Sequence, residues 1–234
     1  MKIYCKSYGD NVILSPEILR QMGKNIQRIC CILTVLLLFQ ACTKHGNDSS
    51  ILPPETRLEA GDLVLRRGNG LVSRAVLAVD RGCTYSHIGM VVDSGGMLMI
   101  AHAVQGEPDF DGDKDRVKLE TADNFFASDR ALAGCILRCK DARASRAAAR
   151  KALELYEKGT LFDHLYDSQD PGRMYCSEFI EYAYSSAGRP LAVGARHDIR
   201  LPGITLRNVI LPADFLKSPY MRCVSRFHGR GAGR

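Results

Sequence analysis

One cysteine stands where a chain can make a thiol reactive. Cys176 lies in the stretch RMYCSEFIEYAY (residues 173–184), directly before a run whose apolar residues repeat with helical spacing. The start of a helix offers unpaired backbone N–H groups and the positive end of the helix dipole, and both favour a thiolate over a thiol. Cysteine is also among the most buried residue types, so a filler of the core is the alternative.

A sulfur nucleophile needs a base, most often a histidine, and the base needs a partner that orients it. His87 lies near the start of the apolar run SHIGMVVD, and His102 lies near the end of MLMIAHAV, with SGG joining the two runs. If the runs form an antiparallel hairpin, both histidines are similarly distant from its turn, and we expect them to be neighbours. Glu107, in the loop that follows, competes with His102 as the orienting partner.

The elements that must position these residues are short strands and a few helices. Strands are predicted where short apolar or alternating runs are bounded by turn residues: EAGDLVLRRG (59–68), SHIGMVVD (86–93), MLMIAHAV (97–104), RVKLE (116–120) and ALAGCILRCK (131–140). Helices are predicted over 70–80, 141–159 and 177–187 from their spacing of apolar residues. Asp141 is a suitable helix cap and Gly159 a suitable terminator. LPADF (211–215) opens a last short element. Segregated strands and helices indicate a single α+β domain.

Five segments carry a resemblance to a known family and occur in that family's order: EAGDLVLRRG, YSHIGMVVDSGGMLMIAHA, LFDHLYD, MYCSEFIEYAY and LPADF. The chain resembles the permuted NlpC/P60 cysteine hydrolases of the YiiX/YebB-like branch, which are related to the lecithin-retinol acyltransferase group. The resemblance covers about residues 59–216. It implies a permuted papain-like fold, with an antiparallel sheet or small barrel packed against helices.

The same resemblance implies roles for three residues. Cys176 is the expected nucleophile, His87 the base and His102 the polar third member, a place often held by Glu in this branch. A neutral His102 can accept a hydrogen bond from His87, but it brings no negative charge to stabilise the imidazolium. The backbone N–H of Cys176 is expected to help hold the oxyanion.

Three further residues are predicted to contact substrate. Family members often have a tyrosine before the cysteine where this chain has Phe162, and Tyr166 and Tyr175 are the candidate substitutes. Ser86, which directly precedes His87, is the third predicted substrate-binding residue.

These residues predict a cysteine hydrolase that cleaves an amide bond, as in cell-wall peptides, or an ester or thioester of a lipid. Thiolate chemistry of this kind needs no metal or organic cofactor. Two alternatives remain: an envelope binding module with a papain-like groove and little turnover, which the histidine at 102 favours, and an acyltransferase. No zinc site is predicted, because Cys135 and Cys139 lack zinc-finger spacing and a second cysteine pair.

The N-terminal residues predict export to the bacterial cell envelope. Lys24 and Arg28 precede an apolar stretch over 29–39, and FQAC then places a small residue before Cys42. The stretch is shorter than the ~20 residues that span a bilayer. It resembles a lipoprotein signal with cleavage before Cys42, whose thiol then carries lipid and anchors the protein to a membrane. An ordinary signal peptide or an N-terminal anchor is the alternative.

The chain is thereby divided into four parts. Residues 1–41 are predicted to be an extension and signal peptide, 42–58 a tether, 59–220 the hydrolase domain and 221–234 a basic tail. Composition agrees with an ordinary globular protein, with 46% hydrophobic and 25% charged residues.

Charge and cysteine content set two further limits. Half of the net charge of +6 lies in residues 1–41, so the remaining basic excess is too small to predict nucleic-acid binding. Apart from Cys42 and Cys176, four cysteines remain after the predicted signal: Cys83, Cys135, Cys139 and Cys223. In an exported protein these four can pair as disulfides, whose connectivity the sequence does not give.

Overall fold

The computed structural model describes residues 49–80, 83–168, 170, 172–201 and 204–229. The chain divides into two units, residues 1–47 and 48–234, and the described residues belong to the second. The predicted signal peptide and Cys42 lie outside the described residues. Among the residues that are described, no helix is long and apolar enough to cross a membrane.

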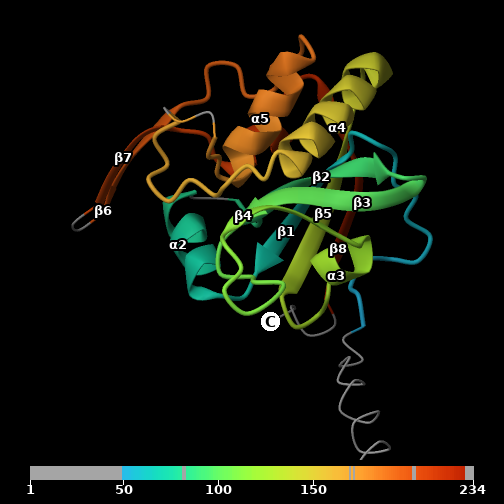
Figure 1. The fold of residues 1–234 in the computed structure, drawn as a ribbon, viewed down its shortest axis with the longest axis horizontal. Coiled ribbons are helices and arrows are strands. Elements are labelled where there is room, and N and C mark those ends of the chain that lie inside the picture. The colour runs from blue at the N-terminus through green and yellow to red at the C-terminus, as the bar shows by residue number, and fades with distance from the viewer. Residues whose placement is uncertain (1–48, 81–82, 169, 171, 202–203, 230–234) are drawn as a thin grey trace, which may run out of the picture. The chain divides into compact units, whose positions relative to one another are not determined.

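Six antiparallel strands form one sheet in the order β4-β3-β2-β1-β5-β8 (Figure 1). The strands are β1 (Leu63–Gly68), β2 (His87–Ser94), β3 (Met97–Val104), β4 (Arg116–Glu120), β5 (Ala131–Cys139) and β8 (Met221–His228). A strand is present in each of the five predicted stretches. The hairpin between β2 and β3 turns at Gly95 and Gly96, which both have positive φ and therefore favour glycine.

Two long helices cover one face of this sheet, α4 (Ala142–Glu157) and α5 (Cys176–Ser186) (Figure 1). The carboxylate of Asp141 caps α4 by accepting from the amides of Arg143 and Ala144 at 3.0 Å each. Apolar side chains of sheet and helices form the main core, including Leu63, Leu65, Met90, Ala152, Phe179 and Ile180. The predicted helices over 141–159 and 177–187 are therefore confirmed.

A second, smaller core lies on the other face of the sheet, because successive side chains of a strand point to opposite faces. It contains Val64, Val91, Ile100 and Ile136 from the strands, and Phe125 and Phe126 from or beside the short helix α3 (Ala122–Phe125). Ile51 and Leu52 pack against this cluster, and the Ile51 N–H donates to the Phe126 carbonyl at 2.9 Å. Residues 51 and 52 of the predicted tether (42–58) thus belong to the folded domain, contrary to the prediction.

Four other elements complete the described fold: α2 (Leu71–Val79), α6 (Pro212–Leu216), and the two-stranded hairpin of β6 (His197–Leu201) and β7 (Ile204–Val209). The helix predicted over 70–80 and the short element predicted at 211–215 are present. The β6–β7 hairpin was not predicted.

The prediction of a basic tail over 221–234 is wrong for residues 221–228, which form β8. This strand pairs with β5 at the edge of the sheet. Only Met221 and Phe227 of β8 are buried. An edge strand with so few buried side chains gives almost no alternating pattern in the sequence.

Candidate active site

Cys176 is the first residue of α5, as its sequence position indicated, and Tyr175 is the residue that caps this helix. The carboxylate of Glu178 reaches back to accept from the Tyr175 N–H at 3.4 Å. The Cys176 side chain is half-buried, and its thiol lies beside the backbone amide of Ile88 in β2. The start of the helix therefore meets the start of the strand that carries His87.

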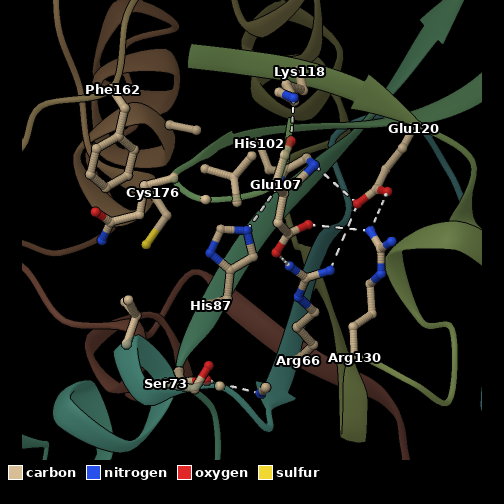
Figure 2. A pocket seen from close by; sticks show the side chains of 18 of the residues that line it. Arg66, Ser73, His87, His102, Glu107, Lys118, Glu120, Arg130, Phe162 and Cys176 are labelled. Atoms are coloured by element: carbon tan, nitrogen blue, oxygen red, sulfur yellow. Dashed lines mark hydrogen bonds and ion pairs between the residues drawn. The ribbon is translucent and has the colours of Figure 1, made fainter. Parts of the chain in front are cut away.

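The two predicted histidines are in direct contact. His87 is the first residue of β2, and its Nε2 lies 2.8 Å from Nδ1 of His102 in β3. Because Nε2 of His87 faces His102, Nδ1 is the ring nitrogen left for the cysteine. Figure 2 shows the Cys176 sulfur and the His87 ring facing each other.

A carboxylate that sequence reasoning missed completes this row of side chains. Oε1 of Glu120, in β4, lies 3.0 Å from Nε2 of His102 (Figure 2). In the β3–β4 register His102 is opposite Lys118, so Glu120 reaches it diagonally from two residues further along the strand. Glu107, the competitor expected from sequence, instead forms ion pairs with Arg66 and Arg130.

Two arginines hold the Glu120 carboxylate in place. Nη1 of Arg130 lies 3.4 Å from Oε2, and Nη1 of Arg66 lies 3.8 Å from Oε1. Burial raises the pKa of Glu120, but the contact with His102 and the two guanidinium charges outweigh it and lower the pKa overall. The carboxylate next to His102 is therefore ionised.

An aromatic ring packs against both histidines. The Phe125 ring stacks on His87 with centroids 5.8 Å apart and meets His102 edge-on at 5.4 Å. The guanidinium of Arg66 lies over the same ring at 4.7 Å and donates to the Phe125 carbonyl at 3.1 Å. Phe125 thus fixes three polar side chains of the site at once.

The resting protonation states differ from the thiolate expected from sequence. Burial, the Arg66 charge and His102 hold the pKa of His87 well below its usual range. Burial also raises the pKa of the Cys176 thiol, although the Ser177 hydroxyl and the backbone amides of Ile88 and Ser177 partly offset it. At rest the pair is a thiol beside a neutral imidazole, because burial outweighs the favourable start of the helix.

These residues share a pocket of about 910 Å³, whose walls include Cys176, His87, His102, Glu120, Arg66 and Arg130. Apolar side chains form another part of the wall, among them Leu71, Val72 and Val76 of α2 and the Phe162 ring that replaces the expected tyrosine. The pocket therefore offers both charged and apolar contacts to a ligand.

Two of the three predicted substrate-binding residues line this pocket. Tyr166 has a positive φ of 55°, and its hydroxyl accepts from Gln105 Nε2 at 3.0 Å. Ser86 is buried, and its Oγ accepts from the Gly68 N–H at 3.0 Å.

Tyr175 does not contact the pocket, contrary to its predicted role. The side chain is 2% exposed, and its hydroxyl accepts from the Ile210 N–H at 2.9 Å. As the capping residue of α5 it turns into the core, while its neighbour Cys176 turns to the pocket. Tyr175 is a packing residue of the scaffold.

No protein-family model matches the chain, and no curated protein does. Among solved structures it is similar to one described as metalloprotein yiiX from Escherichia coli O157:H7, DUF1105. The two share 17% sequence identity over 73% of this chain and 98% of that chain, with a TM-score of 0.54.

That neighbour is described as a metalloprotein. Within the described residues of this chain, no group of three or more His, Cys, Asp or Glu side chains is placed to hold a metal ion. The likeness concerns the fold: the chain has a YiiX-like α+β fold in which a large antiparallel sheet packs against helices.

Proposed function

We propose that the protein is a cysteine hydrolase of the permuted NlpC/P60 type, with Cys176 as nucleophile and His87 as base. The observation that carries the proposal is the row Cys176, His87, His102 and Glu120, which enters one pocket from a helix and three neighbouring strands. Nucleophile, base and orienting groups are the parts that acyl transfer through sulfur requires.

The close polar contacts of this row set the direction of proton transfer. If Nδ1 of His87 accepts the thiol proton, its Nε2–H must donate to Nδ1 of His102, and Nε2–H of His102 then points to Glu120. Each imidazole is held in one tautomer, and the row ends on a carboxylate. Glu120 thus supplies, through His102, the negative charge that a histidine at position 102 lacks.

The reaction starts from a neutral pair. The Cys176 sulfur attacks the substrate carbonyl while its proton passes to His87, and the backbone N–H of Cys176 helps hold the oxyanion. His87 returns the proton to the leaving group, and water activated by His87 then hydrolyses the thioacyl intermediate. A general base that acts during the attack does not require a thiolate at rest.

The proposed substrates are an amide of a cell-wall peptide or an ester or thioester of a lipid. The apolar wall from α2 and Phe162 is suited to an acyl or apolar side chain, and the charged wall suits a peptide. We further propose that the protein acts in the cell envelope, anchored through lipid on Cys42. An acceptor other than water would make the same site an acyltransferase.

The test is turnover with a panel of muropeptides and acyl esters, followed by mass spectrometry of the quenched protein. We expect product formation and an acyl adduct on Cys176, and loss of both in Cys176→Ala. Cys83→Ala is the matched control, because Cys83 is another half-buried free cysteine and does not line the pocket. The mass of the adduct identifies the substrate class.

The raised pKa of the Cys176 thiol is the observation that favours the second candidate, a binding module with little turnover. Equilibrium binding of the same panel separates the two. Ligand binding without any product that depends on Cys176 would support the module and overturn the hydrolase.

A further inference from the structure

Two cysteines far apart in sequence have their sulfur atoms in contact. Sγ of Cys135, in β5, lies 3.8 Å from Sγ of Cys223, in the edge strand β8. Neither residue lines the pocket, so the pair is separate from the site around Cys176. A disulfide requires an S–S distance of about 2.05 Å, so the sulfurs need to approach by about 1.8 Å.

The strand register shows why these two sulfurs meet. Cys223 is opposite Leu137 in the pairing of β5 with β8. Leu137 lies two residues after Cys135, so the two side chains belong to the same face of β5. The pairing is irregular between Ile136 and Leu137. The two cysteines are therefore diagonal neighbours across a local distortion of the ladder.

Among the described residues, the two remaining cysteines outside the proposed active site are engaged elsewhere. The Cys83 sulfur lies 3.4 Å from the backbone N and O of Tyr85, and the Cys139 sulfur accepts from the Asp141 N–H at 3.5 Å. Proximity thus selects one pairing from those that the sequence left open.

The two thiols differ in access to solvent and in chemistry. Cys223 is exposed, whereas Cys135 is buried and its burial raises the pKa of the thiol to about 12. The guanidinium of Arg226 interacts with Cys223 and lies close enough to Cys135 to offset part of that shift. A soluble oxidant therefore reaches Cys223 first, and Cys135 is placed to react with the product.

We propose that Cys135 and Cys223 are a disulfide-forming pair that links the edge strand β8 to β5. The oxidant is a disulfide of the glutathione class. The Cys223 thiolate attacks one of its sulfurs, which forms a mixed disulfide and releases one thiol. The Cys135 thiolate then attacks Sγ of Cys223, which closes the protein disulfide and releases the second thiol. The two cysteine protons pass to the two released thiols, and the oxidant is reduced by the two electrons that the cysteines lose.

The bond has a definite structural consequence. It joins residues 88 positions apart, and the enclosed chain contains α4, α5 with Cys176, and the β6–β7 hairpin. Closing so long a loop restricts the unfolded chain strongly, and the bond ties down a strand that has one neighbour in the sheet. The pairing does not depend on the proposed hydrolase function.

The experiment is oxidation of the full chain with oxidised glutathione at pH 8, an acid quench, alkylation and peptide mapping without reductant. We expect a Cys135–Cys223 linked peptide and a melting temperature about 5–10 °C higher than in dithiothreitol. Cys135→Ser is expected to stop at a stable glutathione adduct on Cys223, whereas the matched control Cys139→Ser is expected to form the link.

Two results would overturn the proposal. The first is recovery of Cys135 and Cys223 as alkylated thiols after oxidation of the unmodified protein. The second is a glutathione adduct on Cys223 that does not progress to the linked peptide. Both results come from the unmodified sequence, so the answer does not depend on whether a variant folds.

Discussion

The histidine side of the pocket and its cysteine side are built by different parts of the molecule. His87, His102 and Glu120 come from three neighbouring strands and contact one another in a row. Cys176 comes from the start of a helix that follows a loop in which Tyr166 and Ser168 have positive φ. The strands fix each histidine from several directions, whereas the cysteine depends on how the loop and helix meet the sheet.

The histidine side and the cysteine side of the pocket therefore have different properties. The histidine side is preorganised, because the Phe125 ring and the ionised Glu120 hold both imidazoles before any substrate binds. The cysteine side sets the resting state, because burial keeps the thiol protonated. The predictions below test this division, beginning with the largest expected effect.

His87→Gln removes the proposed base and should lower Cys176-dependent kcat/KM by about 10³-fold, because general-base catalysis typically contributes 10²–10⁴-fold. Turnover of the substrate found in the panel is the measurement. His164→Gln is the control, since His164 is a half-exposed histidine paired with Asp115 outside the row. Equal losses in the two variants would remove His87 from the mechanism.

Gly89→Ala should damage the histidine side through the scaffold. A Cβ at Gly89 would lie 2.8 Å from Cγ2 of Ile100 and 3.2 Å from Cβ of His102, so the Ile100 side chain or the strands themselves must shift. We expect the free energy of unfolding to fall by about 1–3 kcal/mol, measured by urea denaturation. At Gly70 a Cβ meets nothing within 4 Å, and Gly70→Ala should leave the stability nearly unchanged.

Glu120→Gln should lower kcat/KM by about 10-fold, because the row then ends on a neutral amide. The loss of a negative charge destabilises the imidazolium of His87 and lowers its pKa, so the acid limb of the pH–rate profile should move to lower pH. Glu120→Asp should restore part of the rate. An unchanged pH profile together with a lower rate would reduce Glu120 to a structural residue.

Glu178→Gln tests the cysteine side and should have the smallest effect. Burial raises the pKa of Glu178 to about 7 from its usual 4.5. Between these values the folded state holds a proton that the unfolded state lacks, so stability falls as pH rises through this range. A glutamine at position 178 does not ionise, so the variant keeps the stability that the unmodified protein loses. It should be more stable than the unmodified protein by about 1 kcal/mol at pH 8, a value reduced for the partial exposure of Glu178.

Urea denaturation at pH 4 and pH 8 measures this difference. The two proteins should be about equally stable at pH 4, where the Glu178 carboxyl is protonated in both states. A variant that is less stable at pH 8 would show that the ionised carboxylate supports α5 rather than weakening it.

Local sequence patterns predicted the β2–β3 hairpin and the helix α5, which carry His87, His102 and Cys176. The position of Glu120 depends instead on how β3 pairs with β4. The contact between His87 and His102 follows from a tight turn at Gly95 and Gly96, which a sequence displays. Glu120 reaches His102 only through the β3–β4 register, and a loop over 105–115 separates these strands. No spacing in the sequence encodes that register.

Two predictions were wrong for a related reason: the lowered pKa expected for the Cys176 thiol, and the contact expected between Tyr175 and the pocket. The start of a helix is visible in the sequence, but the burial that opposes ionisation arises from segments distant in the chain. Tyr175 was chosen as a neighbour of the cysteine, yet the turn into α5 sends adjacent side chains in different directions.

The docking of Ile51 has a practical consequence for shortened versions of the protein. Its N–H bonds the Phe126 carbonyl, and the neighbouring Phe125 ring is the platform on which His87 rests. A version that begins after Leu52 would lose the packing of Ile51 and Leu52 against the cluster that contains Phe125. It would still retain Cys176, His87, His102 and Glu120. Residues 49–52 therefore belong in any shortened version that is meant to keep this platform, although they lie well upstream of the first strand of the sheet.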